Sequence, residues 1–340
     1  MRPRPVSNPP NPWSSTDVEW LGEPPTARLH VYADATREIL SRNDSPDVGF
    51  TWSVNPYRGC GHACAYCYAR PTHEYLGFGA GTDFETRIVA KLRAPELLRA
   101  AFERPSWQGE TIAFSGATDC YQPLEASLRL TRRCLEVCAE YRNPIGIVTR
   151  SALVERDIDV IGQLAREGAA SVTISIPILD KMCARAIEPG AAAPERRIET
   201  IARVSAAGIP VGVLVAPIIP GLNDEDIPRV LEAAAAAGAR HAGWTLLRLP
   251  GSVKAVFEER LRAAMPARAD RVLHRIRETR DGRLSDPRFG HRHRGSGTYA
   301  ETIAALFQVA ARRVRLSEDA RAGSGRSPFR RPTAQMSLLP

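Results

Sequence analysis

Short apolar runs alternate with longer amphipathic segments from about residue 49 onward. Runs of this length, rich in Val, Ile and Thr and bounded by turn-forming residues, predict strands. The expected strands are Gly49–Val54, Thr111–Ser115, Ile145–Thr149, Ser171–Ile176, Val211–Ala216 and Gly243–Leu247.

Between these runs, apolar residues recur at intervals of three and four, which is the spacing of one helix face. The clearest examples lie at 134–141, 198–205 and 227–234. Pro194 precedes the second segment, and Gly208 and Gly238 follow the second and third, as is typical of helix boundaries. Successive strand–helix units predict an α/β fold with a parallel sheet. Periodicity alone leaves both a (β/α)6 partial barrel and a doubly wound sheet open.

The two ends of the chain have other patterns. The first 48 residues combine Pro-rich and acidic turns with little periodicity, and the polar segment 317–334 predicts a flexible tail. Helices are expected after residue 250, at Val256–Ala264, Ala269–Arg280 and Tyr299–Arg315. The predicted regions are an N-terminal extension (1–48), the α/β unit (49–250), a helical and basic C-terminal region (251–316) and a tail (317–340).

Positive charge is concentrated near the C-terminus. The formal net charge is +8, and residues 260–315 contain 14 Arg and no Lys against 5 acidic residues. A basic face of this kind is typical of proteins that contact phosphate backbones. A general bias toward Arg explains it equally well, because only Lys91, Lys181 and Lys254 occur in the whole chain.

The chain also has features that bear on its location. No apolar run approaches the roughly 18 residues of a membrane-spanning helix, so we expect no membrane contact. The first residues are rich in Pro, Arg and Asn and lack the apolar segment of a signal peptide. Seven cysteines in such a chain predict a reducing compartment, and we expect a cytoplasmic protein.

Three of these cysteines carry the most informative motif. Cys60, Cys64 and Cys67 form C-x3-C-x2-C within the run 55–68. Clusters that only transfer electrons normally use four cysteines. Three thiolates could hold three irons of a [4Fe–4S] cluster and leave the fourth iron open to a small molecule. The alternative is a structural zinc site completed by His62 or His73.

The C-x3-C-x-Tyr-C loop resembles the signature of the radical S-adenosylmethionine (SAM) superfamily, and the surrounding string resembles its spore-photoproduct-lyase-like branch. The resemblance implies a partial (β/α)6 TIM-like barrel with a [4Fe–4S] cluster on Cys60, Cys64 and Cys67. It implies that SAM binds the open iron and is cleaved reductively to a 5′-deoxyadenosyl radical. It further implies an external electron donor of the flavodoxin or ferredoxin kind and a lyase-like enzyme, with DNA or a DNA-associated substrate as a candidate.

The resemblance also implies SAM contacts at the carboxyl ends of the strands, where functional groups gather in parallel α/β folds. Tyr66 is expected against adenine. Four side chains and one glycine are expected near the methionyl end: Ser115, Gly116, Asp119, Arg150 and Ser175. Asp119 could instead cap a helix, and Ser175 could bond only to backbone. Arg197 could pair with Glu188 or touch SAM.

One departure from the branch concerns hydrogen transfer. Spore photoproduct lyase has a hydrogen-donating cysteine near the second strand end, and the matching position here is Gly116. Cys120 lies four residues later and is the catalytic candidate, with a passive thiol as the alternative. A true pyrimidine-dimer lyase is therefore kept as a second hypothesis, and a non-catalytic DNA- or clamp-binding module with a structural metal as a third.

Two C-terminal segments suggest partners. The loop 286–299 concentrates Arg and His beside glycines, and it could seat a phosphate or remain a solvated loop. The last residues resemble the peptide that docks on the bacterial sliding clamp. In that interpretation a glutamine sets the register and apolar side chains fill a groove, the segment being Gln335, Met336, Ser337, Leu338 and Leu339.

Overall fold

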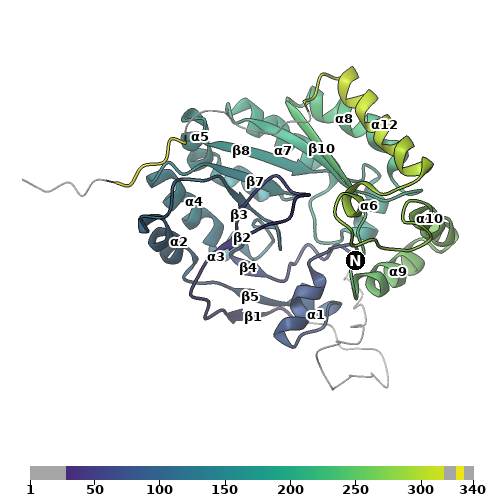
Figure 1. Cartoon of the computed structure of the whole chain (residues 1–340), viewed down its shortest axis with the longest axis horizontal. Coiled ribbons are helices and arrows are strands. Elements are labelled where there is room, and N and C mark those ends of the chain that lie inside the picture. The colour runs from purple at the N-terminus through teal and green to yellow at the C-terminus, as the bar shows by residue number, and fades with distance from the viewer. Residues whose placement is uncertain (1–27, 318–326, 333–340) are drawn as a thin grey trace, which may run out of the picture.

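A central sheet of parallel strands organises the protein in the computed structural model, which describes residues 28–317 and 327–332 (Figure 1). In the described residues its order is β10-β9-β8-β7-β6-β3-β2. β2 (Leu40–Arg42) is antiparallel to β3. The parallel strands are β3 (Trp52–Val54), β6 (Ile112–Phe114), β7 (Ile145–Thr149), β8 (Ala170–Ser175), β9 (Val211–Ile218) and β10 (His241–Leu246).

These strands confirm the predicted runs, with boundaries shifted by a few residues. Apolar side chains such as Ile112, Ile174 and Val213 are fully buried, as expected for a parallel sheet covered by helices. The parallel strands are adjacent in the order of the chain. A doubly wound sheet reverses its strand order at a switch point, so this order confirms the partial (β/α)6 arrangement.

Helices follow the strands and cover the sheet. The segments predicted at 134–141, 198–205 and 227–234 are all helical, and Pro194 occupies the first turn of α7. The helices of this part are α2 (Ala94–Glu103), α3 (Glu125–Leu128), α4 (Leu130–Glu140), α5 (Ile158–Arg166), α6 (Lys181–Ile187), α7 (Pro194–Ala206) and α8 (Ile227–Ala236). Two 3-10 segments precede α5 and α8, at η2 (Ala152–Asp157) and η3 (Asp224–Asp226).

A second, smaller sheet lies beside the first and carries the start of the cysteine loop. It contains β1 (His30–Ala33), β5 (Arg87–Ala90) and β4 (Tyr57–Arg58), in the order β1-β5-β4. β1 and β2 thus place part of the predicted N-terminal extension in the two sheets. The cysteine loop continues from β4 into η1 (Arg70–Leu76) and α1 (Thr82–Thr86).

The C-terminal region is helical, as predicted. It consists of α9 (Val253–Ala264), α10 (Pro266–Glu278), the short α11 (His291–Arg294) and α12 (Thr298–Arg313). α12 packs against α8, and α9 packs against α10 and α6. Figure 1 shows α9 and α10 on the side of the molecule opposite α2 and α4. Among the described residues, no helix is both long and apolar enough to cross a membrane.

The structure differs from the predicted flexible tail at residues 327–332. Phe329 contacts Phe102 and stacks on Tyr141, with ring centroids 5.8 and 6.3 Å away. Arg331 donates hydrogen bonds to the carbonyl oxygens of Phe102, Arg104 and Trp107. These aromatic contacts and backbone acceptors fix the segment on α2 and α4. The clamp-like peptide 335–339 lies outside the described residues.

The Phe329 contacts predict that this segment stabilises the fold. We expect Phe329→Ala to lower the free energy of unfolding by about 1–2 kcal/mol, because a half-buried aromatic surface is lost. Phe289→Ala is the matched control, since the Phe289 side chain is 59% exposed. Urea unfolding measures both variants. An unchanged midpoint for Phe329→Ala would show that the contact contributes nothing.

Candidate functional site

The three cysteines lie in one loop, which we call the cluster loop (59–69), between β4 and η1. Gly59 begins the loop with φ +78°. A Cβ atom there would meet His73 and the Phe84 carbonyl oxygen at 2.9 Å, so the loop needs glycine at this position. The Cys60 N–H donates to the same carbonyl oxygen of Phe84 at 2.8 Å. The loop is therefore anchored at its first cysteine.

Two buried arginines fix the backbone of the cluster loop. Arg70 donates from Nε and Nη2 to the Cys64 carbonyl oxygen at 3.0 and 2.8 Å. Arg260, from α9, donates to the Ala63 carbonyl oxygen. Both guanidinium groups also pair with Glu85. One carboxylate thus pairs with both cations that hold the loop and offsets part of the cost of their burial.

A third contact joins the cluster loop to the loop after β6. The side chain of Gln122 accepts from the Gly61 N–H at 3.1 Å and donates to the Gly59 carbonyl oxygen at 3.0 Å. Gln122 is fully buried, so both of its polar atoms require such partners. The amide fixes the distance between the cysteines and the residues predicted to hold SAM.

The thiols are available to a cluster. All three cysteines are free; Cys60 and Cys64 are buried, whereas Cys67 is partly exposed. Burial raises the pKa of the Cys64 thiol to about 12, and the Arg150 guanidinium, 3.2 Å from its sulfur, opposes the rise. Metal ligation requires the thiolate, which such a cation favours. Three thiols on one braced loop beside a cation fit a cluster held by three thiolates.

The two histidines of the zinc alternative face other groups. His73 lies 2.8 Å from the Arg87 carbonyl oxygen through Nε2. Burial lowers the pKa of His73, which keeps the ring neutral. Nδ1 of His62 lies 3.4 Å from the Asp119 carboxylate. Each imidazole therefore has a partner outside the thiols, and the donor set favours the cluster over a Cys3His zinc site.

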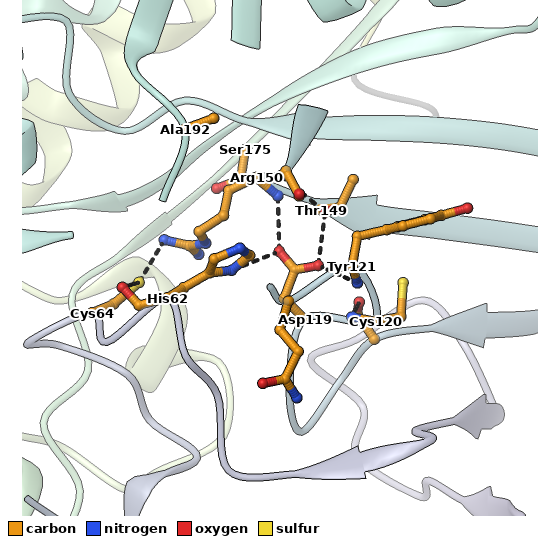
Figure 2. Close-up of polar contacts among 12 residues, drawn as sticks. His62, Cys64, Asp119, Cys120, Tyr121, Thr149, Arg150, Ser175 and Ala192 are labelled. Carbon is orange, nitrogen blue, oxygen red and sulfur yellow. Dashed lines mark hydrogen bonds and ion pairs between the residues drawn. The ribbon is translucent and has the colours of Figure 1, made fainter. Parts of the chain in front are cut away.

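Asp119 is the centre of the first polar network, which Figure 2 shows. Its carboxylate accepts from Thr149 Oγ1 at 2.7 Å and from the Arg150 and Tyr121 backbone N–H groups at 2.9 Å each. Burial alone would raise the pKa of Asp119, but His62 and these donors outweigh it, and the pKa lies well below its usual range. Asp119 is thus ionised, and it connects the β6 and β7 ends to the cluster loop.

Glu188 is the centre of the second network. Its carboxylate pairs with Arg150 on one oxygen and with Arg197 at 2.6 Å on the other. The Tyr66 hydroxyl donates to Glu188, and the Arg150 guanidinium lies 5.6 Å from the centre of the Tyr66 ring. Burial would raise the pKa of Glu188, but Arg197 and Arg150 lower it. The ion pair between Arg197 and Glu188 confirms one of the two predicted alternatives for Arg197.

The structure brings three of the predicted SAM residues together beside the cluster loop. They are Arg150, Asp119 and Tyr66. The Ser115 hydroxyl accepts from the Cys120 N–H at 3.1 Å. The Ser175 hydroxyl donates to the Ala216 carbonyl oxygen at 3.1 Å, which is the backbone-bonded alternative.

Cys120 does not join this group. Its side chain has no exposed surface and belongs to the hydrophobic core. Figure 2 shows its sulfur directed away from His62 and Arg150. The position agrees with the passive-thiol alternative and does not favour hydrogen donation.

Tyr68 joins the cluster loop to the end of β6. It directly follows the last cysteine, Cys67, and its hydroxyl donates to the Gly116 carbonyl oxygen. Gly116 has φ +147°, a conformation that L side chains rarely adopt. The Tyr68 side chain is 49% exposed, so this hydrogen bond lies at the surface of the site.

Comparisons with known proteins identify the family of the chain. The family model of the radical SAM superfamily matches residues 54–234. An uncharacterized protein of Mycobacterium tuberculosis is 40% identical over 210 residues, which cover 61% of this chain and 62% of that protein. The chain thus spans less than two thirds of the length of this curated relative. A protein of Pseudomonas phage M6, named radical SAM Nalpha-GlyT isomerase, is 27% identical over 55% of this chain and 38% of its own length.

Solved structures show the same fold. Spore photoproduct lyase complexed with dinucleoside spore photoproduct has a TM-score of 0.62 at 16% identity, covering 84% of this chain and 79% of that one. A double mutant of the lyase with bound AdoMet and the same ligand has a TM-score of 0.62 at 16% identity, covering 84% and 78%. The family match spans more than half of the chain and contains the cluster loop. This chain belongs to the radical SAM superfamily.

Proposed function

We propose that the protein binds a [4Fe–4S] cluster through Cys60, Cys64 and Cys67 and uses it to cleave SAM reductively. The observation that supports this most directly is the braced three-thiol loop with Arg150 at its edge. When bound, the cluster would supply the electron for SAM cleavage. An external donor of the flavodoxin or ferredoxin kind would then reduce the cluster again. The protein supplies binding, orientation and exclusion of water.

The surrounding residues have separate roles in this proposal. Arg150 binds the SAM carboxylate, and the ion pair with Glu188 orients the Arg150 guanidinium. Asp119 fixes the Arg150 backbone and accepts from the SAM ammonium group. Tyr66 lies against adenine with its hydroxyl held by Glu188. Ser115, Gly116 and Ser175 shape the backbone around the methionyl end.

We propose DNA, or a DNA-associated molecule, as the substrate. Two observations support it: the excess of Arg in residues 260–315 and the fold shared with a lyase that binds a dinucleoside photoproduct. The pyrimidine-dimer lyase itself is the less favoured hypothesis, because position 116 is glycine and Cys120 is buried in the core. The peptide 335–339 remains a separate prediction of clamp binding, and a cytoplasmic location remains an expectation.

The cluster ligands predict a simple pattern of loss. Anaerobic reconstitution with iron and sulfide should give about four of each per chain. Each of Cys60→Ala, Cys64→Ala and Cys67→Ala should lose the iron and the 5′-deoxyadenosine formed with dithionite and SAM. Cys138→Ala is the control, because Cys138 lies in α4 and packs in a core cluster that contains no residue of the cluster loop. A cysteine variant of the loop that keeps both iron and SAM cleavage would contradict its assignment.

The role of Arg150 can be separated from its ion pair by comparing two arginines that share Glu188. Arg150→Lys should raise the Kd of SAM about tenfold, because lysine keeps the charge but loses the planar fork. Arg197→Lys should leave the Kd within about threefold, since Arg197 bonds to backbone and Glu188. Equilibrium dialysis with the reconstituted protein measures both. Equal losses would mean that Arg150 acts only through Glu188.

The substrate proposal has its own assay. The reconstituted protein is incubated with SAM, dithionite and either lesion-containing or undamaged DNA, and the DNA is then digested to nucleosides. We expect mass spectrometry to show a changed nucleoside in one of the two samples. Unchanged nucleosides in both, with 5′-deoxyadenosine present, would reject DNA while leaving SAM cleavage intact.

A further inference from the structure

Arg248 differs in its surroundings from the other arginines of the protein. It follows the carboxyl end of β10 and is half-buried. Every other described arginine that is buried or half-buried, Arg280 excepted, forms an ion pair with a carboxylate. These pairs are formed by Arg58, Arg70, Arg87, Arg132, Arg142, Arg150, Arg156, Arg196, Arg197, Arg260, Arg275 and Arg292. No carboxylate of the described residues pairs with Arg248.

The side chains that contact Arg248 directly carry no negative charge. Its guanidinium lies 5.5 Å from the centre of the Tyr68 ring. Nη1 lies 3.1 Å from Nε2 of His293. Burial lowers the pKa of Arg248 and the positive charge of Arg292 lowers it further, while Tyr68 and the Asp47 carboxylate offset part of this shift. A partly desolvated cation beside a second cation is unfavourable unless an anion joins it.

Hydrogen bonds and an ion pair fix the backbone around Arg248 at the carboxyl end of β10. The buried Arg280 donates to the Leu247 carbonyl oxygen, next to Arg248, and to the His291 carbonyl oxygen at the start of α11, each at 2.7 Å. Asp47 in the β2–β3 loop pairs with Arg292 and accepts from the Gly290 N–H at 2.8 Å. These contacts connect three segments near Arg248: the end of β10, the α11 loop and the β2–β3 loop.

One exposed aromatic ring contacts Arg248, and a second contacts the neighbouring Arg292. Tyr68 is half-exposed and directly follows the cluster ligand Cys67. Phe289 is 59% exposed, and the Arg292 guanidinium lies 4.4 Å from the centre of its ring. Proteins that bind single nucleic-acid strands commonly combine cations that contact the phosphate backbone with exposed aromatic rings on which bases stack.

We propose that Arg248 and His293 bind a backbone phosphodiester of a nucleic-acid strand, which places a neighbouring nucleotide over Tyr68 and the cluster loop. The inference rests on the proposed function, because it identifies the substrate class of that same site. Arg248 supplies two donors in a fork that matches phosphate oxygens. His293 turns from an acceptor of the Arg248 hydrogen bond into a donor to phosphate. Arg280 is a positioning residue, since it does not contact the phosphate itself but holds the backbone next to Arg248 and His293.

The test measures binding apart from catalysis. A fluorescein-labelled oligothymidylate of about 12 nucleotides is titrated into the reconstituted protein and followed by fluorescence anisotropy at several salt concentrations. Arg248→Gln should weaken binding about tenfold and reduce the slope of log K against log salt by about 1. Arg229→Gln is the control of equal charge, because the Arg229 side chain is 72% exposed on α8. It should bind within about twofold of the wild type.

A second variant keeps the test decisive if Arg248→Gln fails to fold. His293 faces Arg248, Arg292, Asp47 and Arg280, and burial with the two nearest arginines lowers its pKa to about 4. A bound phosphodiester would raise that pKa, so wild-type binding should tighten as the pH falls from about 7 to about 5. His293→Gln should bind more weakly and lose this pH dependence.

The outcomes separate the two proposals. Equal binding by Arg248→Gln, His293→Gln and Arg229→Gln would overturn the phosphate site, whether or not the wild type cleaves SAM. Failure of the wild type to cleave SAM would reject the proposed function without affecting the binding comparison. Inorganic phosphate and thymidine monophosphate serve as competitors. Displacement of the oligonucleotide by either one at equal concentration would assign the site to free phosphate compounds and overturn the nucleic-acid proposal.

Discussion

Two carboxylates, the buried Glu188 and the partly buried Glu85, hold the site together. Glu85 pairs with both Arg70 and Arg260, whose remaining donors fix the backbone of the cluster loop. Glu188 pairs with both Arg150 and Arg197 and accepts a hydrogen bond from the Tyr66 hydroxyl. Removing one partner of a buried pair typically costs about 3–5 kcal/mol, because it leaves the other charge unpaired. Because breaking these ion pairs is unfavourable, they hold the loop in a defined geometry before any cofactor binds.

The fold brings these groups to one edge. In parallel α/β folds the carboxyl ends of the strands face the same side, and loops there carry function. Asp119 follows β6, Arg150 follows β7, and Arg248 follows β10. The smaller sheet delivers the cluster loop to that edge through β4, and α9 reaches it with Arg260. Cofactor chemistry and the proposed phosphate contact therefore lie on neighbouring strand ends.

Sequence reasoning could predict the elements whose cause is local. The parallel strands were predictable because each is a short apolar run, and the cluster loop because its cysteines lie within eight residues. The position of Arg150 beside the cysteines followed from the rule on strand ends. The ion pair of Arg197 with Glu188 was one of two alternatives, since Arg197 lies near the start of α7 and Glu188 lies shortly before that helix.

The residues that escaped prediction act over long distances in sequence. Arg260 reaches the cluster loop across 197 residues, and Gln122 reaches it across 61. No periodicity reveals such contacts. Cys120 stands beside Asp119 in sequence, but its thiol turns into the core while the carboxylate turns toward Arg150. Phe329 was assigned to a polar tail because nothing near it in the sequence indicates its contacts with Phe102 and Tyr141.

The most direct measurement of the central claim is electron paramagnetic resonance of the anaerobically purified and reduced protein, with iron, sulfide and zinc determined on the same sample. The account predicts the signal of a reduced [4Fe–4S] cluster, and a change in that signal when SAM is added, because SAM binds the iron that no cysteine holds. One zinc ion per chain without inorganic sulfide, or a cluster signal that SAM leaves unchanged, would contradict it.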